Sequence, residues 1–88
     1  MNTITVSKLD DIKYLVVVES RTTTEHTVTL PAVYYQTLTR GRITPEELIK
    51  KSFEFLLERE PNTSILRRFE LSLISTYFPD YESKVGLF

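Results

Sequence analysis

The chain has 88 residues, of which 41% are hydrophobic and 11% aromatic, and it carries 11 basic and 12 acidic side chains. This composition predicts one globular domain, residues 1–88, rather than a disordered chain. The balanced charge argues against a nucleic-acid partner, because binders of nucleic acid usually have a basic excess that neutralises phosphates. The absence of cysteine excludes disulfides, thiolate metal sites and a cysteine nucleophile.

The beginning of the chain, MNTITVSKLDD, has no basic region followed by an apolar run, so we predict no signal peptide. The longest apolar run, YLVVV at 14–18, is too short to span a bilayer. We therefore expect a cytoplasmic protein that does not contact a membrane.

The first third of the chain is expected to form strands at about 3–6, 12–20 and 23–30. The apolar run inside the second strand predicts burial on both faces of a sheet. Alternation in the third strand predicts two faces: His26, Val28 and Leu30 on one, and Glu25, Thr27 and Thr29 on the other. The short polar links predict an antiparallel hairpin or a three-stranded sheet, with a turn at 9–11.

Two or three helices should follow the strands. The first is expected at about 31–40, where Pro31 can open it and Gly41 can end it. The second, at about 45–60, has a clear start: Thr44 caps it, Pro45 takes its first position and Glu47 closes a capping box.

The second helix has one charged face and one apolar arc. The charged face comprises Glu47, Lys50, Lys51, Glu54 and Glu58, and the arc comprises Leu48, Ile49, Phe53, Phe55, Leu56 and Leu57. The spacing predicts ion pairs four residues apart, such as Lys50 with Glu54. The width of the arc predicts contact with both a sheet and another helix.

Apolar residues at helical spacing predict a third helix at about 64–78, although Ser72 could divide it into two. Pro79 should end it, and the order of the remaining tail, 80–88, stays open. The complete pattern predicts an α+β fold with a sheet packed against helices.

No group of residues indicates catalysis, a cofactor or a metal. The single histidine, His26, has no nucleophile or orienting carboxylate at a suitable spacing, and we interpret it as a half-buried strand residue. Two glycines cannot form a phosphate-binding loop. We therefore predict a protein that is not an enzyme, with no cofactor and no metal.

A candidate interaction surface is predicted near the C-terminus. Arg67 and Arg68 are either solvated arginines or a small patch for anions and carboxylates. Tyr81, Leu87 and Phe88 lie beyond the expected helix end, so they either pack on another subunit or fold back on the domain.

The order of strand, short helix and capped helix in EHTVTLPAVYYQTLTRGRITPEELIKKSFEFLL, 25–57, resembles the ribbon-helix-helix family of DNA-binding repressors and antitoxins. The resemblance implies a dimer in which paired strands read the major groove through Glu25, Thr27 and Thr29. It also implies a phosphate site at the amides that follow Thr44. Pro45 removes one of those amides, and Glu25 would direct a carboxylate toward DNA.

The segment FEFLLEREPNTSILRRFELSLISTYFP, 53–79, resembles a group of short uncharacterised bacterial proteins of unknown function. This resemblance implies no activity. Within the segment, we expect Glu58 and Arg59 to form an ion-pair cluster with Arg67 and Arg68.

The leading functional hypothesis is a small non-enzymatic protein-interaction module that binds another protein or a second copy of itself as a homodimer. The alternative is a dimeric ribbon-helix-helix-type DNA-binding regulator or antitoxin. A small-ligand pocket beside the third helix also stays open. The sequence does not identify the biological role or the partner.

Overall fold

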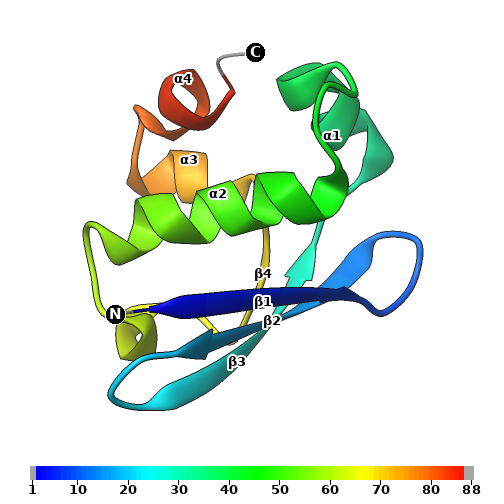
Figure 1. Ribbon diagram of the computed structural model, residues 1–88. Helices are drawn as coiled ribbons and strands as arrows, with labels where there is room; N and C mark the ends of the chain where they lie inside the picture. Colours follow the sequence, from blue (N-terminus) through cyan, green and yellow to red (C-terminus); the bar gives the residue numbers. More distant parts are fainter. Residues whose placement is uncertain (1, 87–88) are drawn as a thin grey trace.

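A four-stranded mixed sheet, covered on one face by helices, forms the architecture in a computed structural model that describes residues 2–86 (Figure 1). Strands β1, β2 and β3 come first in the chain, and β4 joins the sheet after α1 and α2. The bounds are β1 Thr3–Lys8, β2 Lys13–Glu19, β3 Thr23–Thr29, α1 Ala32–Thr39, α2 Pro45–Leu57, η1 Asn62–Ser64, β4 Arg68–Glu70, α3 Leu73–Tyr77 and α4 Tyr81–Val85. The predicted α+β class is therefore confirmed.

The first three strands form the expected antiparallel meander. Thr3 pairs with Glu19 across β1 and β2, and Lys13 pairs with Thr29 across β2 and β3. The predicted turn after β1 is organised by Asp10, whose carboxylate accepts from the amides of Ile12 and Lys13 at 3.0 and 2.9 Å. This local hydrogen bonding is typical of Asp in turns.

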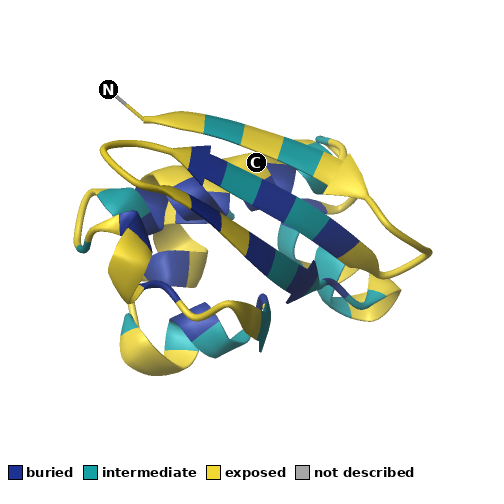
Figure 2. Ribbon diagram, turned by 90° about the horizontal axis from the view of Figure 1, so that it is seen from below, coloured by how far each residue is buried: buried dark blue, intermediate teal, exposed yellow. Residues whose placement is uncertain are grey.

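The sheet has one buried face and one open face, as the alternating colours of its strands show in Figure 2. In β2, the buried side chains are Tyr14, Val16 and Val18, whereas Leu15 and Val17 are only half-buried on the open face. The expectation that this apolar run is buried on both faces was therefore wrong. The helices cover only one side, so the open face keeps Leu15 and Val17 among threonines and charged residues.

Strand β4 was not predicted, and residues 64–78 do not form a single helix. Instead, η1 is followed by β4 and then by α3. The alternative that Ser72 begins a separate short helix is confirmed by α3, whose N-cap is Ser72. Strand β4 runs parallel to β3, with Arg68 beside Thr27 and Glu70 beside Thr29. The free edge of β3 explains the change: the Thr27 amide donates to the Arg67 carbonyl at 2.7 Å, and the Leu71 amide donates to the Thr29 carbonyl at 2.9 Å. Such long-range pairing overrides a local helical pattern.

Helix α2 begins as predicted and lies over the sheet next to β1. The Thr44 hydroxyl accepts from the Glu47 amide at 3.1 Å, and the Glu47 carboxylate accepts from the Thr44 amide at 3.0 Å. The helix ends at Leu57, three residues before the expected end at 60. Its apolar arc enters the core, where Leu48, Ile49 and Phe53 are fully buried, and its charged face is exposed.

Helices α1 and α4 lie above α2, on the side away from the sheet (Figure 1). Helix α1 matches the segment predicted at 31–40, and Arg40 and Gly41 end it in left-handed conformations with φ of 55° and 74°. The tail whose order the sequence left open begins with α4, in which Tyr81 and Val85 are buried. Over residues 2–86, no helix has the length and apolar character needed to cross a membrane.

Replacing Thr44 with alanine tests the capping box. We expect the free energy of unfolding to fall by about 1 kcal/mol, because the Glu47 amide loses its acceptor at the helix start. Urea unfolding measures the change. Thr37→Ala is the matched control, since Thr37 is exposed in α1 and its hydroxyl caps no helix, and it should cause no comparable loss. Equal losses in both variants would contradict the role of the cap.

Candidate functional site

A chain of buried polar groups joins β3 to the segment that precedes β4. The Asn62 side-chain amide donates to the Thr24 hydroxyl at 3.0 Å and to the Thr22 carbonyl at 2.7 Å. The Thr24 hydroxyl lies 2.8 Å from Nε2 of His26, and Nδ1 of His26 lies 2.7 Å from the carbonyl oxygen of Leu66. Thr24, His26 and Asn62 are all buried, so these bonds hold η1 and Leu66 against β3.

The carbonyl of Leu66 determines the protonation of His26. A carbonyl oxygen can only accept, so Nδ1 carries the proton, and Nε2 accepts from the Thr24 hydroxyl in the neutral ring. Burial lowers the pKa of His26 below its ordinary value of 6.5, and Arg67 acts in the same direction, whereas the bond to Leu66 raises it. Both ring nitrogens have partners and the ring is fully buried, so the geometry gives His26 a structural role.

An apolar groove lies on the surface beside this network. Its volume is about 270 Å³, and it lies between the end of α2, the loop after η1, β4 and α3. The lining residues are Leu56, Glu60, Ser64, Ile65, Leu66, Phe69, Leu73, Ile74, Tyr77 and Phe78. Leu66 and Tyr77, which both line the groove, are 49% and 65% exposed.

Packing around Arg59 supports the α3 side of the groove. The Arg59 guanidinium stacks 3.6 Å from the centroid of the Phe55 ring and donates to the Phe55 carbonyl at 2.9 Å. It also pairs with Asp80 at 3.4 Å and with Glu58 at 3.2 Å. Phe55 meets Phe78 edge-on at 5.8 Å between ring centroids. These contacts connect the end of α2 to the chain that leaves α3, and so position Phe78.

The buried hydroxyls of Ser52 and Tyr81 form a second polar contact, which is also structural. Ser52 donates to the Leu48 carbonyl at 2.8 Å, and its oxygen lies 2.6 Å from the Tyr81 hydroxyl. Burial raises the pKa of Tyr81, against the opposing effect of the Ser52 bond, so this phenol stays protonated. Neither hydroxyl has a basic partner, and neither reaches the surface.

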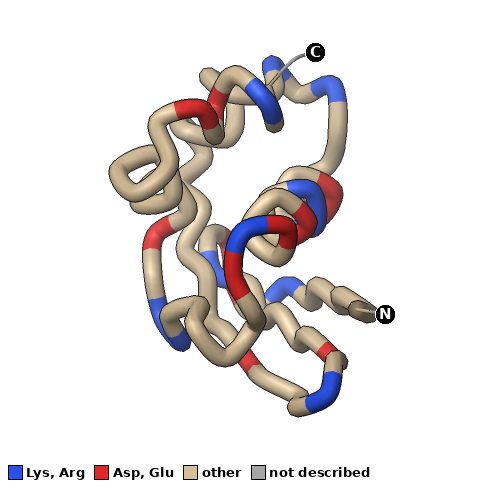
Figure 3. The backbone as a smooth tube through the Cα atoms, turned by 90° about the vertical axis from the view of Figure 1, so that its left-hand side faces the viewer, with Lys and Arg blue, Asp and Glu red and all other residues tan. Residues whose placement is uncertain are grey.

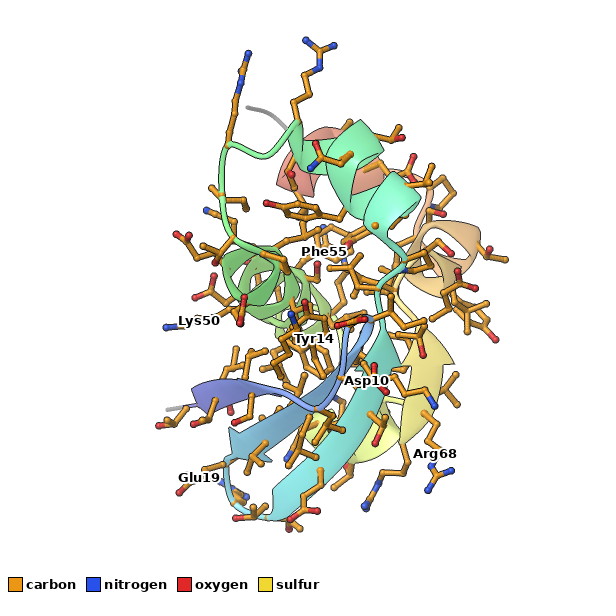
Figure 4. All side chains as sticks on the ribbon, turned by 90° about the vertical axis from the view of Figure 1, so that its right-hand side faces the viewer. Asp10, Tyr14, Glu19, Lys50, Phe55 and Arg68 are labelled. Carbon is orange, nitrogen blue, oxygen red and sulfur yellow. The ribbon has the colours of Figure 1, made fainter. Side chains whose placement is uncertain are left out.

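The predicted interaction residues do not form one surface. Arg67 and Arg68 are exposed at the start of β4, next to Leu66 of the groove. Figure 4 shows Arg68 extending from the sheet into solvent. Tyr81 is fully buried rather than exposed, because α4 packs it against α2. Leu87 and Phe88 lie outside the described residues. The expected cluster of Glu58 and Arg59 with Arg67 and Arg68 was wrong, since Arg59 pairs with Glu58 and Asp80.

The positions proposed for DNA contact are separated in the structure. Glu25, Thr27 and Thr29 lie on the open face of the sheet, as expected from their alternation. Strand β3 pairs with β2 along one edge and, at Thr27–Thr29, with β4 along the other, so neither edge is open over its full length for a strand from a second subunit. At Thr44, the capping box uses the Glu47 amide, and the Glu46 and Glu47 carboxylates flank this helix end.

The groove residues Leu66 and Tyr77 fall within the single helix expected at 64–78, but Leu66 lies in the loop before β4 and Tyr77 is the last residue of α3. One signal in the sequence could have found β4: Arg68, Phe69, Glu70 and Leu71 alternate between polar and apolar, which is typical of a strand. Among residues 2–86, no group of three or more side chains is placed to hold a metal ion. Charged residues of both signs are distributed along the backbone in Figure 3.

Comparison of the chain with protein-family models, with curated proteins and with solved structures finds no match.

The network around His26 predicts a specific pH dependence of stability. The folded state keeps His26 neutral, while the unfolded chain binds a proton below the ordinary pKa of 6.5. The unfolded state therefore binds more protons as the pH falls, so the free energy of unfolding should decrease from pH 6.5 downward. The pKa values of Glu47 and Asp10 are also lowered in the folded state. Their protonation reduces the free energy of unfolding only at lower pH, below the ordinary pKa values of 4.5 and 3.8.

Urea unfolding at a series of pH values measures this effect. A His26→Asn variant keeps an amide donor for the Leu66 carbonyl but has no titratable group there, so it should lose the decrease that begins near pH 6.5. An identical slope in both proteins would contradict the assignment.

Proposed function

We propose that the chain is a non-enzymatic protein-interaction module of the cytoplasm, and that the groove binds an extended apolar segment of a partner protein. The observation that carries this proposal is the exposure of Leu66 and Tyr77 beside a hollow lined mainly by apolar side chains. Tyrosine is favoured in protein interfaces because its ring is apolar and its hydroxyl can stay hydrated. The groove has room for a few apolar side chains and is smaller than most sites for small ligands.

The edge of β4 can supply backbone hydrogen bonds to the same segment. The Arg67 carbonyl and the Leu71 amide bond to β3. Because successive residues of a strand direct their backbone groups to opposite edges, those of Arg68 and Glu70 point away from β3. An extended peptide can pair with these groups while its alternate side chains enter the groove. This mode of binding requires a free edge strand beside an apolar hollow, and β4 provides both.

The charge beside the groove favours acidic residues in the partner segment. Arg67 and Arg68 are exposed and make no ion pair within residues 2–86. Arg67 immediately precedes β4 and Arg68 is its first residue, whereas the charged side chain that lines the groove itself is Glu60. We therefore propose an apolar segment with flanking Asp or Glu, because such a sequence complements both the groove and the two arginines.

The DNA-binding alternative stays a prediction without structural support. Because β3 pairs with β2 and, at Thr27–Thr29, with β4, it has no complete free edge for an intersubunit ribbon, and the acidic residues at the start of α2 oppose phosphate binding.

Selection from a random peptide library on the immobilised protein tests the proposed function. We expect apolar peptides with acidic flanks, and we expect Leu66→Ser or Tyr77→Ser to weaken their binding by roughly tenfold, since each removes apolar contact area. Isothermal titration calorimetry with the selected peptides measures the change.

Val33→Ser provides the matched control. Val33 is 79% exposed on α1, away from the groove, so its replacement should leave peptide binding unchanged. Failure to select any peptide, or equal loss with the Val33 variant, would count against the groove as the binding site.

A further inference from the structure

The outer edge of β1 presents unpaired backbone groups. At the hairpin end, the Leu9 amide donates to the Lys13 carbonyl at 2.8 Å. In an antiparallel pair, every second residue bonds to the same neighbouring strand, so the backbone groups of Ser7, Thr5 and Thr3 also bond to β2. The amides and carbonyls of Ile4, Val6 and Lys8 therefore point away from the sheet. Strand β1 lies at the edge of the sheet, and no described strand pairs with its outer side. It contains no proline, and its single lysine stands at its end, so the usual protection of an edge strand is weak.

Charged side chains of α2 stand beside this edge. A shallow hollow between them and β1 is lined by Asn2, Thr3, Ile4, Lys50, Glu54, Leu57 and Glu58. Figure 4 shows Lys50 extending from α2 into solvent on the side of β1. The sequence pattern predicts an ion pair between Lys50 and Glu54, but neither residue forms one within residues 2–86. Both charges are therefore available to a partner.

The spacing along β1 matches the spacing along α2. The two elements run in opposite directions, and Ile4 lies beside the second half of α2 (Figure 1). Two strand residues span about 6.6 Å and four helix residues about 6 Å, so the step from Ile4 to Val6 is close in length to the step from Glu54 to Lys50. A two-fold axis at Thr5 exchanges Ile4 with Val6, and it brings the hollow that Ile4, Lys50 and Glu54 line next to the same hollow of the second copy.

We infer that β1 pairs antiparallel with β1 of a second copy of this chain, about a two-fold axis at Thr5. The pairing joins two sheets into one, and Ile4 of each copy bonds to Val6 of the other. Lys50 of each copy then faces Glu54 of the other, so the charge pattern is complementary to itself. This contact uses the edge of the sheet opposite to β4, and it does not depend on the groove.

Charge variants provide the test, measured by analytical ultracentrifugation. The wild-type chain should sediment as a dimer of twice its 10.3 kDa mass. In the Lys50→Glu homodimer, the new glutamate of each copy faces Glu54 of the other, so both contacts become repulsive. In the Glu54→Lys homodimer, the new lysine of each copy faces Lys50 of the other, with the same result. Each variant alone should therefore dimerise at least about tenfold more weakly. An equimolar mixture of the two should regain the dimer, because Glu then faces Lys at both contacts.

A second pair of variants controls for net charge. Lys51→Glu and Glu25→Lys change the charge by the same amounts at exposed positions that do not line the hollow. Each should remain a dimer alone. Leu66→Ser should also remain a dimer, which separates this inference from the peptide-binding role of the groove. Circular dichroism establishes that every variant is folded.

Amide exchange gives an independent measurement on the unaltered protein. The amides of Ile4 and Val6 should be protected at concentrations that favour the dimer and should exchange fast on dilution. A wild-type chain that is monomeric at all concentrations would overturn the inference. So would a dimer that Lys50→Glu and Glu54→Lys leave intact, or a mixture of these two variants that stays monomeric.

Discussion

The hydrogen bond from Nδ1 of His26 to the Leu66 carbonyl, together with the bonds of Asn62 to β3, connects the two parts of the chain on which the fold depends. On one side is the local meander of β1 to β3, and on the other is the segment that returns from α2. Because the buried groups would be left unpaired if this segment moved away, the network directs it along β3 and allows β4 to add in parallel. The floor of the groove, Ile65 and Phe69, follows from that placement.

Local patterns were sufficient to predict the first two thirds of the fold. Alternation located β3 and the face of His26, and the Thr44 capping box located the start of α2, because each signal depends only on residues close in the chain. The region after residue 60 could not be predicted in the same way. Its structure depends on contacts with His26, about 40 residues earlier, and these override the helical spacing of Leu66, Phe69 and Leu73.

The candidate surfaces were predicted less well than the fold. Arg67 and Arg68 are exposed, but Tyr81, which was assigned to the same surface, is buried by α4 against Phe55. The sequence could not indicate the groove, since its walls come from α2, β4 and α3 and meet only in three dimensions. The two functional proposals use opposite edges of one sheet, so a peptide at β4 and a second copy at β1 can bind at the same time.

Hydrogen exchange in a Thr24→Val variant tests most directly whether the buried network holds β4 in place. Valine keeps the shape of threonine but removes the hydroxyl that joins Asn62 to His26. We expect that the amides of Thr27 and Leu71, which bond between β3 and the β4 segment, lose much more protection than the amides between β1 and β2. A uniform loss of protection across all four strands, or no loss at Thr27 and Leu71, would contradict this expectation.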